Sequence, residues 1–150
     1  MSGNDLSSYP PLTSDKAFAE FVMTEVRQAL TEILIDSRTL EFDSFGQPLL
    51  SELEYACQRG VRVHCLIDAV GSRNFIHDHP ALFTRLHTQI RIQHLRTAEN
   101  NRIVFDRELA VIGNHPLRAV SPADESEIYR VSRIITGPAA AELAQNIDIA

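Results

Sequence analysis

Four stretches of the chain have the apolar spacing or the terminal residues of a helix. In the first, Ser14 is a favourable N-cap for a helix with an apolar face of Phe18, Phe21, Val22, Val26, Ala29 and Leu30. The second, residues 48 to 60, begins with proline and ends with glycine, the order that backbone geometry favours at helix ends. A short helix is expected at residues 81 to 87, and a last one opens after Gly137 with Pro138 in its first turn.

Short apolar runs rich in β-branched residues lie between these helices and predict strands. They occupy residues 32 to 40, 61 to 68, 102 to 105, 109 to 112 and 128 to 136, and Ile90 and Ile92 mark one more. Arg107 and Glu108 form a two-residue turn between two of these strands.

The order of these elements predicts the fold class. Helices alternate with strands early in the chain, whereas the later strands follow each other directly, which indicates an α/β domain with a mixed β-sheet and helices on both faces. A chain of 150 residues is near the usual size of one domain, and we assign residues 14 to 150 to it. Residues 1 to 13 are polar, contain two prolines, and are expected to form a flexible leader.

Composition and charge exclude several classes of protein. The net charge of −6 opposes general binding to nucleic acid. No apolar run approaches the roughly 20 residues that span a bilayer, and the N-terminus lacks the features of a secretory signal, so a cytoplasmic protein is expected. Cys57 and Cys65 have neither a redox nor a zinc spacing and are interpreted as reduced core thiols.

Residues 99 to 114 contain a strand, an aspartate, a second strand and a glycine in that order, an arrangement that is used for chemistry on phosphates. Asp106 follows the first strand, and Gly113 ends the second. Lys16 is the only lysine among 14 basic residues, so any mechanism that needs a lysine must use it or proceed without one. The sequence contains no phosphate-binding glycine loop, dinucleotide-binding motif or serine nucleophile motif.

Three stretches resemble one half of a phospholipase D superfamily protein, over roughly residues 18 to 149. They are FGQPLLSELEYACQRGVRVHCLIDAVGS (45 to 72), RIVFDRELAVIGN (102 to 114) and IYRVSRIITGPAAAEL (128 to 143). The first resembles the family's helix, R-G-V turn, apolar strand and strand-end aspartate, here Asp68. The second resembles its strand, aspartate, turn, strand and glycine, and the third its closing strand, Gly-Pro and final helix.

The resemblance implies a catalytic motif, H-x-K-x-x-x-x-D, with a glycine seven residues after the aspartate. Active members join two such motifs, in which one histidine attacks phosphorus, the other protonates the leaving group, and the lysines bind phosphate oxygens. Asp106 and Gly113 match this motif, but Glu99 occupies the histidine position and Asn101 the lysine position. A carboxylate repels a phosphodiester, and an amide carries no charge.

A second register aligns His94, Arg96 and Asn101 with the motif. It places Thr97, Ala98, Glu99 and Asn100 where the family has an apolar buried strand, and Glu108 at the glycine position, so we favour the first register.

Each candidate site residue also has a simpler interpretation. Asp106 could be only a turn acid, and His115 either a displaced catalytic histidine or a surface histidine on a loop. The candidate ligand-binding residues are Asp68, Arg102, Gly113 and Asn114. Asp68 could instead cap a loop, and Arg102, on the strand face opposite Asn101, could be solvated or paired.

His77 and His79 could both face one metal ion, with His64 or His87 completing the set. No spacing fixes a third ligand, so we expect neither a metal nor another cofactor.

Two hypotheses for function follow from these residues. The first is a catalytically degenerate phospholipase D-like domain that binds a phosphate-containing ligand or another protein, or assembles as a homodimer through an apolar face near Asp106 and Gly113. The second is a phosphodiesterase or phosphatidyltransferase with a rebuilt site that uses His94 or His115 with Asp106. The substituted histidine and lysine positions favour the first.

Overall fold

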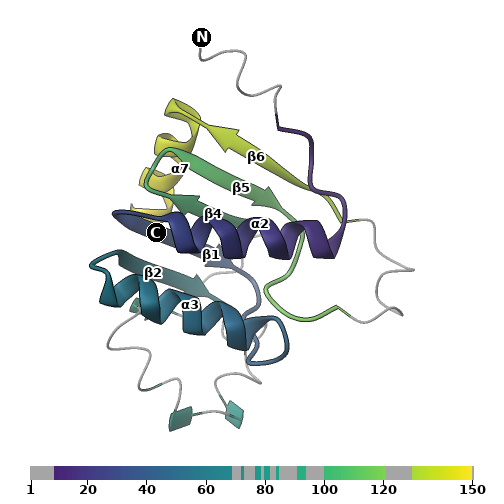
Figure 1. The fold of residues 1–150 in the computed structure, drawn as a ribbon, viewed down its shortest axis with the longest axis vertical. Helices are drawn as coiled ribbons and strands as arrows, with labels where there is room; N and C mark the ends of the chain where they lie inside the picture. Colours follow the sequence, from purple (N-terminus) through teal and green to yellow (C-terminus); the bar gives the residue numbers. More distant parts are fainter. Residues whose placement is uncertain are drawn as a thin grey trace.

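The structure, a computed structural model, describes residues 9–68, 72, 77–78, 80–81, 84, 91–93, 100–120 and 130–149. Six strands form one mixed sheet: β1 (Glu32–Ser37), β2 (Arg62–Ile67), β3 (Arg91–Gln93), β4 (Asn101–Phe105), β5 (Leu109–Gly113) and β6 (Ser132–Thr136). The helices that pack on it are α2 (Asp15–Gln28), α3 (Gly46–Gln58) and α7 (Pro138–Ile149). The predicted α/β class, with a mixed sheet and helices on both faces, is confirmed (Figure 1).

The strands lie in the order β3-β2-β1-β4-β5-β6. Strands β1, β2 and β3 are parallel, because the chain returns through α3 between β1 and β2, whereas β4, β5 and β6 each run antiparallel to the preceding strand in this order. The central strand β1 is buried along all six residues, as expected for a strand with cover on both faces.

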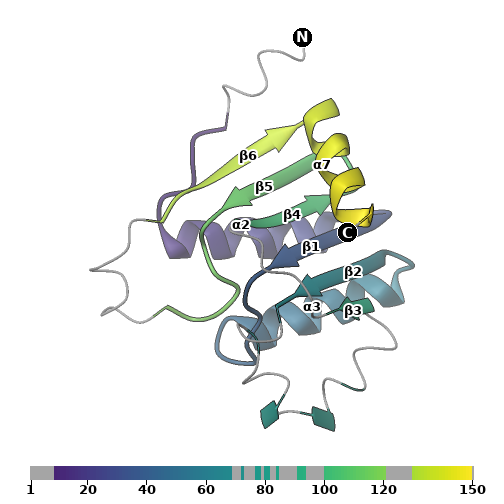
Figure 2. The same cartoon turned by 180° about the vertical axis from the view of Figure 1, so that it is seen from behind.

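Side chains alternate along β1 between two apolar layers. Ile33 and Ile35 face α2 and α3, in the larger core cluster, while Leu34 faces α7 in a smaller cluster. Figures 1 and 2 show α2 and α3 side by side on one face of the sheet and α7 on the other, across β1, β4, β5 and β6.

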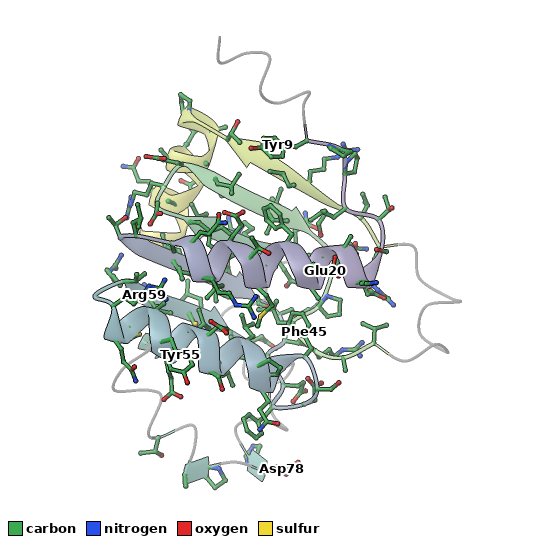
Figure 3. The ribbon with its side chains drawn as sticks, viewed as in Figure 1. Tyr9, Glu20, Phe45, Tyr55, Arg59 and Asp78 are labelled. Carbon is green, nitrogen blue, oxygen red and sulfur yellow. The ribbon has the colours of Figure 1, made fainter. Side chains whose placement is uncertain are left out.

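The first helix begins as predicted, with the Ser14 hydroxyl accepting the Ala17 N–H at 3.0 Å. It ends earlier than the apolar spacing indicated: Ala29 already has an extended backbone, and Leu30 is 79 % exposed instead of lying on the buried face. Arg59, at the end of α3, donates to the carbonyls of Val26 and Ala29 and thereby satisfies the C-terminus of α2 (Figure 3).

The last strand is shorter than predicted, because β6 begins at Ser132 rather than at residue 128. Leu12, assigned to the flexible leader, forms an isolated bridge with Ser132 through two backbone hydrogen bonds of 2.8 and 2.9 Å.

Most of the predicted helix at 81 to 87 lies outside the described residues, as does Ile90. No helix among the described residues is long and apolar enough to cross a membrane.

Candidate functional site

The strand directions separate the motif residues into two groups. Because β4 is antiparallel to β1 and β5, its first residue, Asn101, pairs with Gly113 and lies beside the end of β1, whereas Asp106 follows its last residue. Five strand residues span roughly 16 Å. We therefore distinguish an Asn101 end and an Asp106 end of the sheet.

The Asp106 carboxylate is fully engaged in holding the turn between α2 and β1. It accepts the backbone N–H groups of Leu30, Thr31 and Glu32, at 3.0, 2.7 and 2.9 Å, and the Thr31 hydroxyl at 2.9 Å. Burial by itself would raise the pKa of Asp106, but these hydrogen bonds to the charged form lower it below the ordinary value. These contacts agree with the interpretation of Asp106 as a turn acid.

Asp106 also belongs to the hairpin turn itself. Phe105 pairs with Leu109, so the turn contains three residues rather than the predicted two. Asp106 and Arg107 have positive φ angles of 55° and 56°, in a region where aspartate is more easily tolerated than most residues.

At the other end of β4, the Asn101 side chain ties three segments together. Its amide oxygen accepts the Arg38 N–H at 2.9 Å and the Ser37 hydroxyl at 3.3 Å. Its amide nitrogen donates to the His115 carbonyl at 2.6 Å. The residue at the family's phosphate-binding position is therefore committed to the protein's own chain on both sides of its amide.

Gly113 and Asn114 hold the start of β6 against β5. A Cβ atom on Gly113 would lie 2.3 Å from both the Ser132 hydroxyl and the Val131 carbonyl oxygen, so only glycine fits this approach. The Asn114 amide oxygen accepts the Val131 N–H at 2.8 Å. Both predicted ligand-binding residues thus have structural contacts.

His115 is buried, with 1 % exposure, so its interpretation as a surface histidine is wrong. Its Nδ1 atom lies 2.7 Å from the Ser132 hydroxyl, and its ring stacks on Phe18 with centroids 4.7 Å apart. Burial lowers the pKa of His115 and Arg130 lowers it further, although Asp15 partly offsets this by favouring the charged ring. Because His115 follows Gly113, the structure places it at the Asn101 end and does not bring it to Asp106.

Two other predicted ligand-binding residues, Arg102 and Asp68, lie near the Asn101 end. Arg102 forms an ion pair with the fully buried Asp36 on the α7 side of the sheet, which confirms that it is paired. Asp68 follows β2 next to the end of β1, and its carbonyl accepts the Ser72 N–H at 2.9 Å.

The remaining candidates are only partly described. His94 and Glu99 lie outside the described residues, as do His79 and His87, while His77 is exposed and His64 is buried in β2. Asn101 begins a strand, whereas the second register would put it after one, so the observed strands agree with the first register. Across the described part of the chain, no three metal-ligating side chains come together.

The structure adds residues that the sequence did not indicate. Asp15, Arg130 and Ser132 surround His115, and Thr31 binds Asp106. Each of these contacts joins residues far apart in the chain, so no local pattern could have revealed it.

The sequence matches no family model and no curated protein. Among solved structures, Nuc from Salmonella typhimurium, a phospholipase D family member, is 16 % identical with a TM-score of 0.68, over 93 % of each chain. NucT from Helicobacter pylori is 11 % identical with a TM-score of 0.65, over 92 % of this chain and 91 % of that one. TrmBL2, an archaeal chromatin protein, is 14 % identical with a TM-score of 0.67, and the chain spans only 51 % of its length. Likeness at these identities shows a shared fold.

Proposed function

Because the chain has a phospholipase D-like fold, we propose that it is a catalytically inactive domain of this kind, which binds or assembles instead of hydrolysing phosphodiesters. The observation that carries the proposal is that the four motif positions fall into two pairs with different roles. Asp106 and Gly113, which match the family, have structural contacts in this chain. Glu99 and Asn101, which depart from it, occupy the positions whose expected role is chemical.

The structural contacts of Asp106 and Gly113 are a sufficient reason for their presence, so these two residues do not imply a catalytic activity. Asp106 anchors the start of β1, and Gly113 allows β6 to approach β5. Replacement of the second pair removes the nucleophile and the phosphate-binding cation. Loss of a nucleophile that acts together with its partners removes nearly all of the chemical rate.

The alternative enzyme, with a rebuilt site, has less support. His115 and Asp106 lie at opposite ends of the sheet, and the His115 ring is buried against Phe18 and Ser132. A general base must come within hydrogen-bond reach of the proton that it removes. His94 remains the candidate for such a site.

The test is hydrolysis of bis-p-nitrophenyl phosphate, phosphatidyl lipids and DNA by the whole chain, with and without EDTA. We expect no turnover above buffer, and none in the His94→Ala variant. Turnover that is lost on changing His94→Ala, with the circular dichroism spectrum unchanged, would contradict the proposal. Elemental analysis of untagged protein, with His77→Ala as the comparison, tests the expected absence of a metal.

Assembly as a homodimer is part of the same proposal, since the chain corresponds to one half of the paired arrangement that the family resemblance implies. The apolar face proposed near Asp106 and Gly113 is not a single surface, because these residues lie at opposite ends of the sheet. Among the described residues, the large exposed hydrophobics are Tyr9, Leu30 and Tyr55. They do not form one patch in the chain's fold: Tyr9 precedes α2, Leu30 lies between α2 and β1, and Tyr55 is on α3; Figure 3 shows Tyr9 and Tyr55 apart. The proposal therefore rests on symmetry, since a two-fold axis is the simplest way to pair identical halves.

Light scattering at micromolar concentration separates the dimer from the alternatives. We expect about twice the chain mass of 16.8 kDa. A mass of one chain, unchanged on concentrating, would contradict the dimer and leave binding to a different partner. DNA binding at low salt is measured in parallel, because TrmBL2 is described as binding DNA; the net charge of −6 leads us to expect none here.

A further inference from the structure

A buried polar cluster joins the start of α2 to the start of β6, and the proposed function does not use it. His115, Arg130 and Ser132 are 1 %, 6 % and 1 % exposed, and Asp15 lies beside them in the first turn of α2. Leu12 pairs with Ser132 at the same place. We call this junction, formed by Leu12, Asp15 and Phe18 on one side and His115, Arg130 and Ser132 on the other, the α2–β6 seam.

The two ring nitrogens of His115 have different surroundings. Nδ1 is 2.7 Å from the Ser132 hydroxyl, a short hydrogen bond. Nε2 is buried, has no hydrogen-bond partner among the described residues, and lies 3.7 Å from Asp15 Oδ1. That carboxylate oxygen already accepts from Arg130 Nε at 3.1 Å.

These surroundings define the neutral form of the ring. Since Nε2 faces a carboxylate, the hydrogen of the neutral ring is best placed there, and Nδ1 then accepts from the Ser132 hydroxyl. A second proton on Nδ1 turns this acceptor into a donor, so the Ser132 hydroxyl must rotate and accept from the ring. The resulting cation would be buried beside Arg130, with one already shared carboxylate for compensation.

We propose that His115 is an acid-sensitive latch: its neutral ring closes the α2–β6 seam, and uptake of a proton opens the seam while the rest of the sheet stays folded. This inference is independent of the proposed function. The charged groups that face the ring are Asp15 from α2 and Arg130 from the segment before β6, and the other faces are covered by Phe18 and Ser132.

The stability of the closed seam depends on pH because His115 binds fewer protons in the closed state than in the open state. Burial holds the pKa of His115 below its ordinary value of 6.5. The latch therefore contributes its full stability above that value and loses it as the pH falls below it. Between the closed-state and open-state pKa values the opening equilibrium changes by at most about tenfold for each pH unit, since one proton is taken up.

Hydrogen exchange measured by NMR at pH 7.5 and 5.5, corrected for intrinsic rates, tests the latch. The reporters are the amides of Leu12 and Ser132, which bond to each other's carbonyls across the seam, and the references are amides of β1 and β4. We expect protection at the reporters to fall by up to about tenfold at pH 5.5, with little change at the references. His115→Asn should abolish this difference, and His77→Asn, at an exposed histidine, should leave it unchanged.

Equal loss of protection in all strands, or the same pH dependence in His115→Asn, would overturn the latch. If His115→Asn does not fold, the wild-type exchange measurement is combined with an NMR titration of the His115 ring, which is expected to give a pKa below the ordinary value. An NMR titration of the His115 ring at or above its ordinary pKa would also overturn the proposal.

Discussion

The two ends of β4 differ in what their polar side chains bind. At the Asp106 end, one charged group accepts four hydrogen bonds from a single short segment, Leu30 to Glu32. At the Asn101 end, a neutral amide makes three bonds to two different segments, at Ser37–Arg38 and His115. Asn101 and Asp106, five residues apart in one motif, thus act at opposite ends of the strand. Asp106 acts through hydrogen bonds to a charged group and Asn101 through hydrogen bonds of a neutral amide.

Under the proposed function, this difference explains how two positions of the family's motif are kept while two others are replaced. The Asp106 carboxylate is stabilised in the fold by its hydrogen bonds to backbone groups, and its loss would remove the acceptor of three N–H groups, of which that of Glu32 is partly buried. Asn101 makes neutral bonds that a lysine could not reproduce, since an ammonium group cannot accept the Arg38 N–H. The Asn101 amide is therefore used here to hold neighbouring segments of the chain together.

The largest effect is expected from Asp106→Ala. Removal of the carboxylate should lower the free energy of unfolding by roughly 3 to 4 kcal/mol, because hydrogen bonds to a charged group are worth about 1.5–3 kcal/mol each and are not additive. Urea denaturation at pH 7 measures it. The matched control is Glu108→Ala, at the exposed acid of the same turn, with an expected change within about 0.5 kcal/mol.

The charge of Asp106 can be separated from its shape with Asp106→Asn, which keeps the side-chain size and tolerates a positive φ. Since hydrogen bonding holds the pKa of Asp106 below its ordinary value of 3.8, its contribution is present above that pH and is lost as the pH falls below it. We expect the wild type to lose more stability than Asp106→Asn between pH 5 and pH 3. Equal losses would contradict a stabilising charge at this end.

A comparison of two glycines tests the close approach near the Asn101 end. Gly113→Ala should cost roughly 2 to 3 kcal/mol, because the added methyl group meets backbone and Ser132 atoms at 2.3 Å. Gly137→Ala, with a φ of 73° and no atom within 4 Å of the added group, should cost only about 1 kcal/mol. Thermal unfolding of both variants decides between steric and conformational causes; a smaller loss for Gly113→Ala would show that β6 can move away.

The sequence predicted the elements well because their apolar periods are local. The runs that became β1, β2, β4 and β5 are rich in Ile, Val and Leu, and Ser14 and Pro138 marked two helix starts. It misplaced Leu30, whose apolar spacing continued past the true helix end, and the start of β6, where the chain is held by Leu12.

The site was less predictable because its contacts join distant segments. A linear motif puts Asp106, Gly113 and His115 within ten residues, yet the hairpin sends the first to one end and the others to the opposite end. Only the strand pairing fixes that separation. The burial of His115 likewise depends on contacts with Phe18 and Ser132, which are distant in the sequence and could not be predicted from the residues next to His115.

At the Asn101 end, a smaller effect is expected from Asn101→Ala. Loss of its three neutral bonds should cost about 1 to 2 kcal/mol, roughly half the cost of Asp106→Ala. Asn101→Lys should be no more stable than Asn101→Ala and should gain no phosphodiesterase activity. The control is Asn100→Ala, at the exposed neighbouring asparagine; similar losses at both positions would mean that the Asn101 bonds contribute little.

The smallest effect, and one of opposite sign, is expected from Glu25→Gln at the Asp106 end. Glu25 lies in the last turn of α2, where a negative charge is unfavourable. It lines a pocket together with Asp106 and Glu108 of the β4–β5 turn. Burial raises the pKa of Glu25 and Asp106 raises it further, so its charged form is destabilising at neutral pH. The variant should gain a few tenths of a kcal/mol at pH 7, and the gain should vanish as the pH falls below 4.5, where Glu25 is neutral in both states. Repeating the substitution in the Asp106→Asn background isolates the repulsion between the two acids. A gain that is equally large there would assign the effect to burial and the helix end alone, and would leave Asp106 with favourable contacts only.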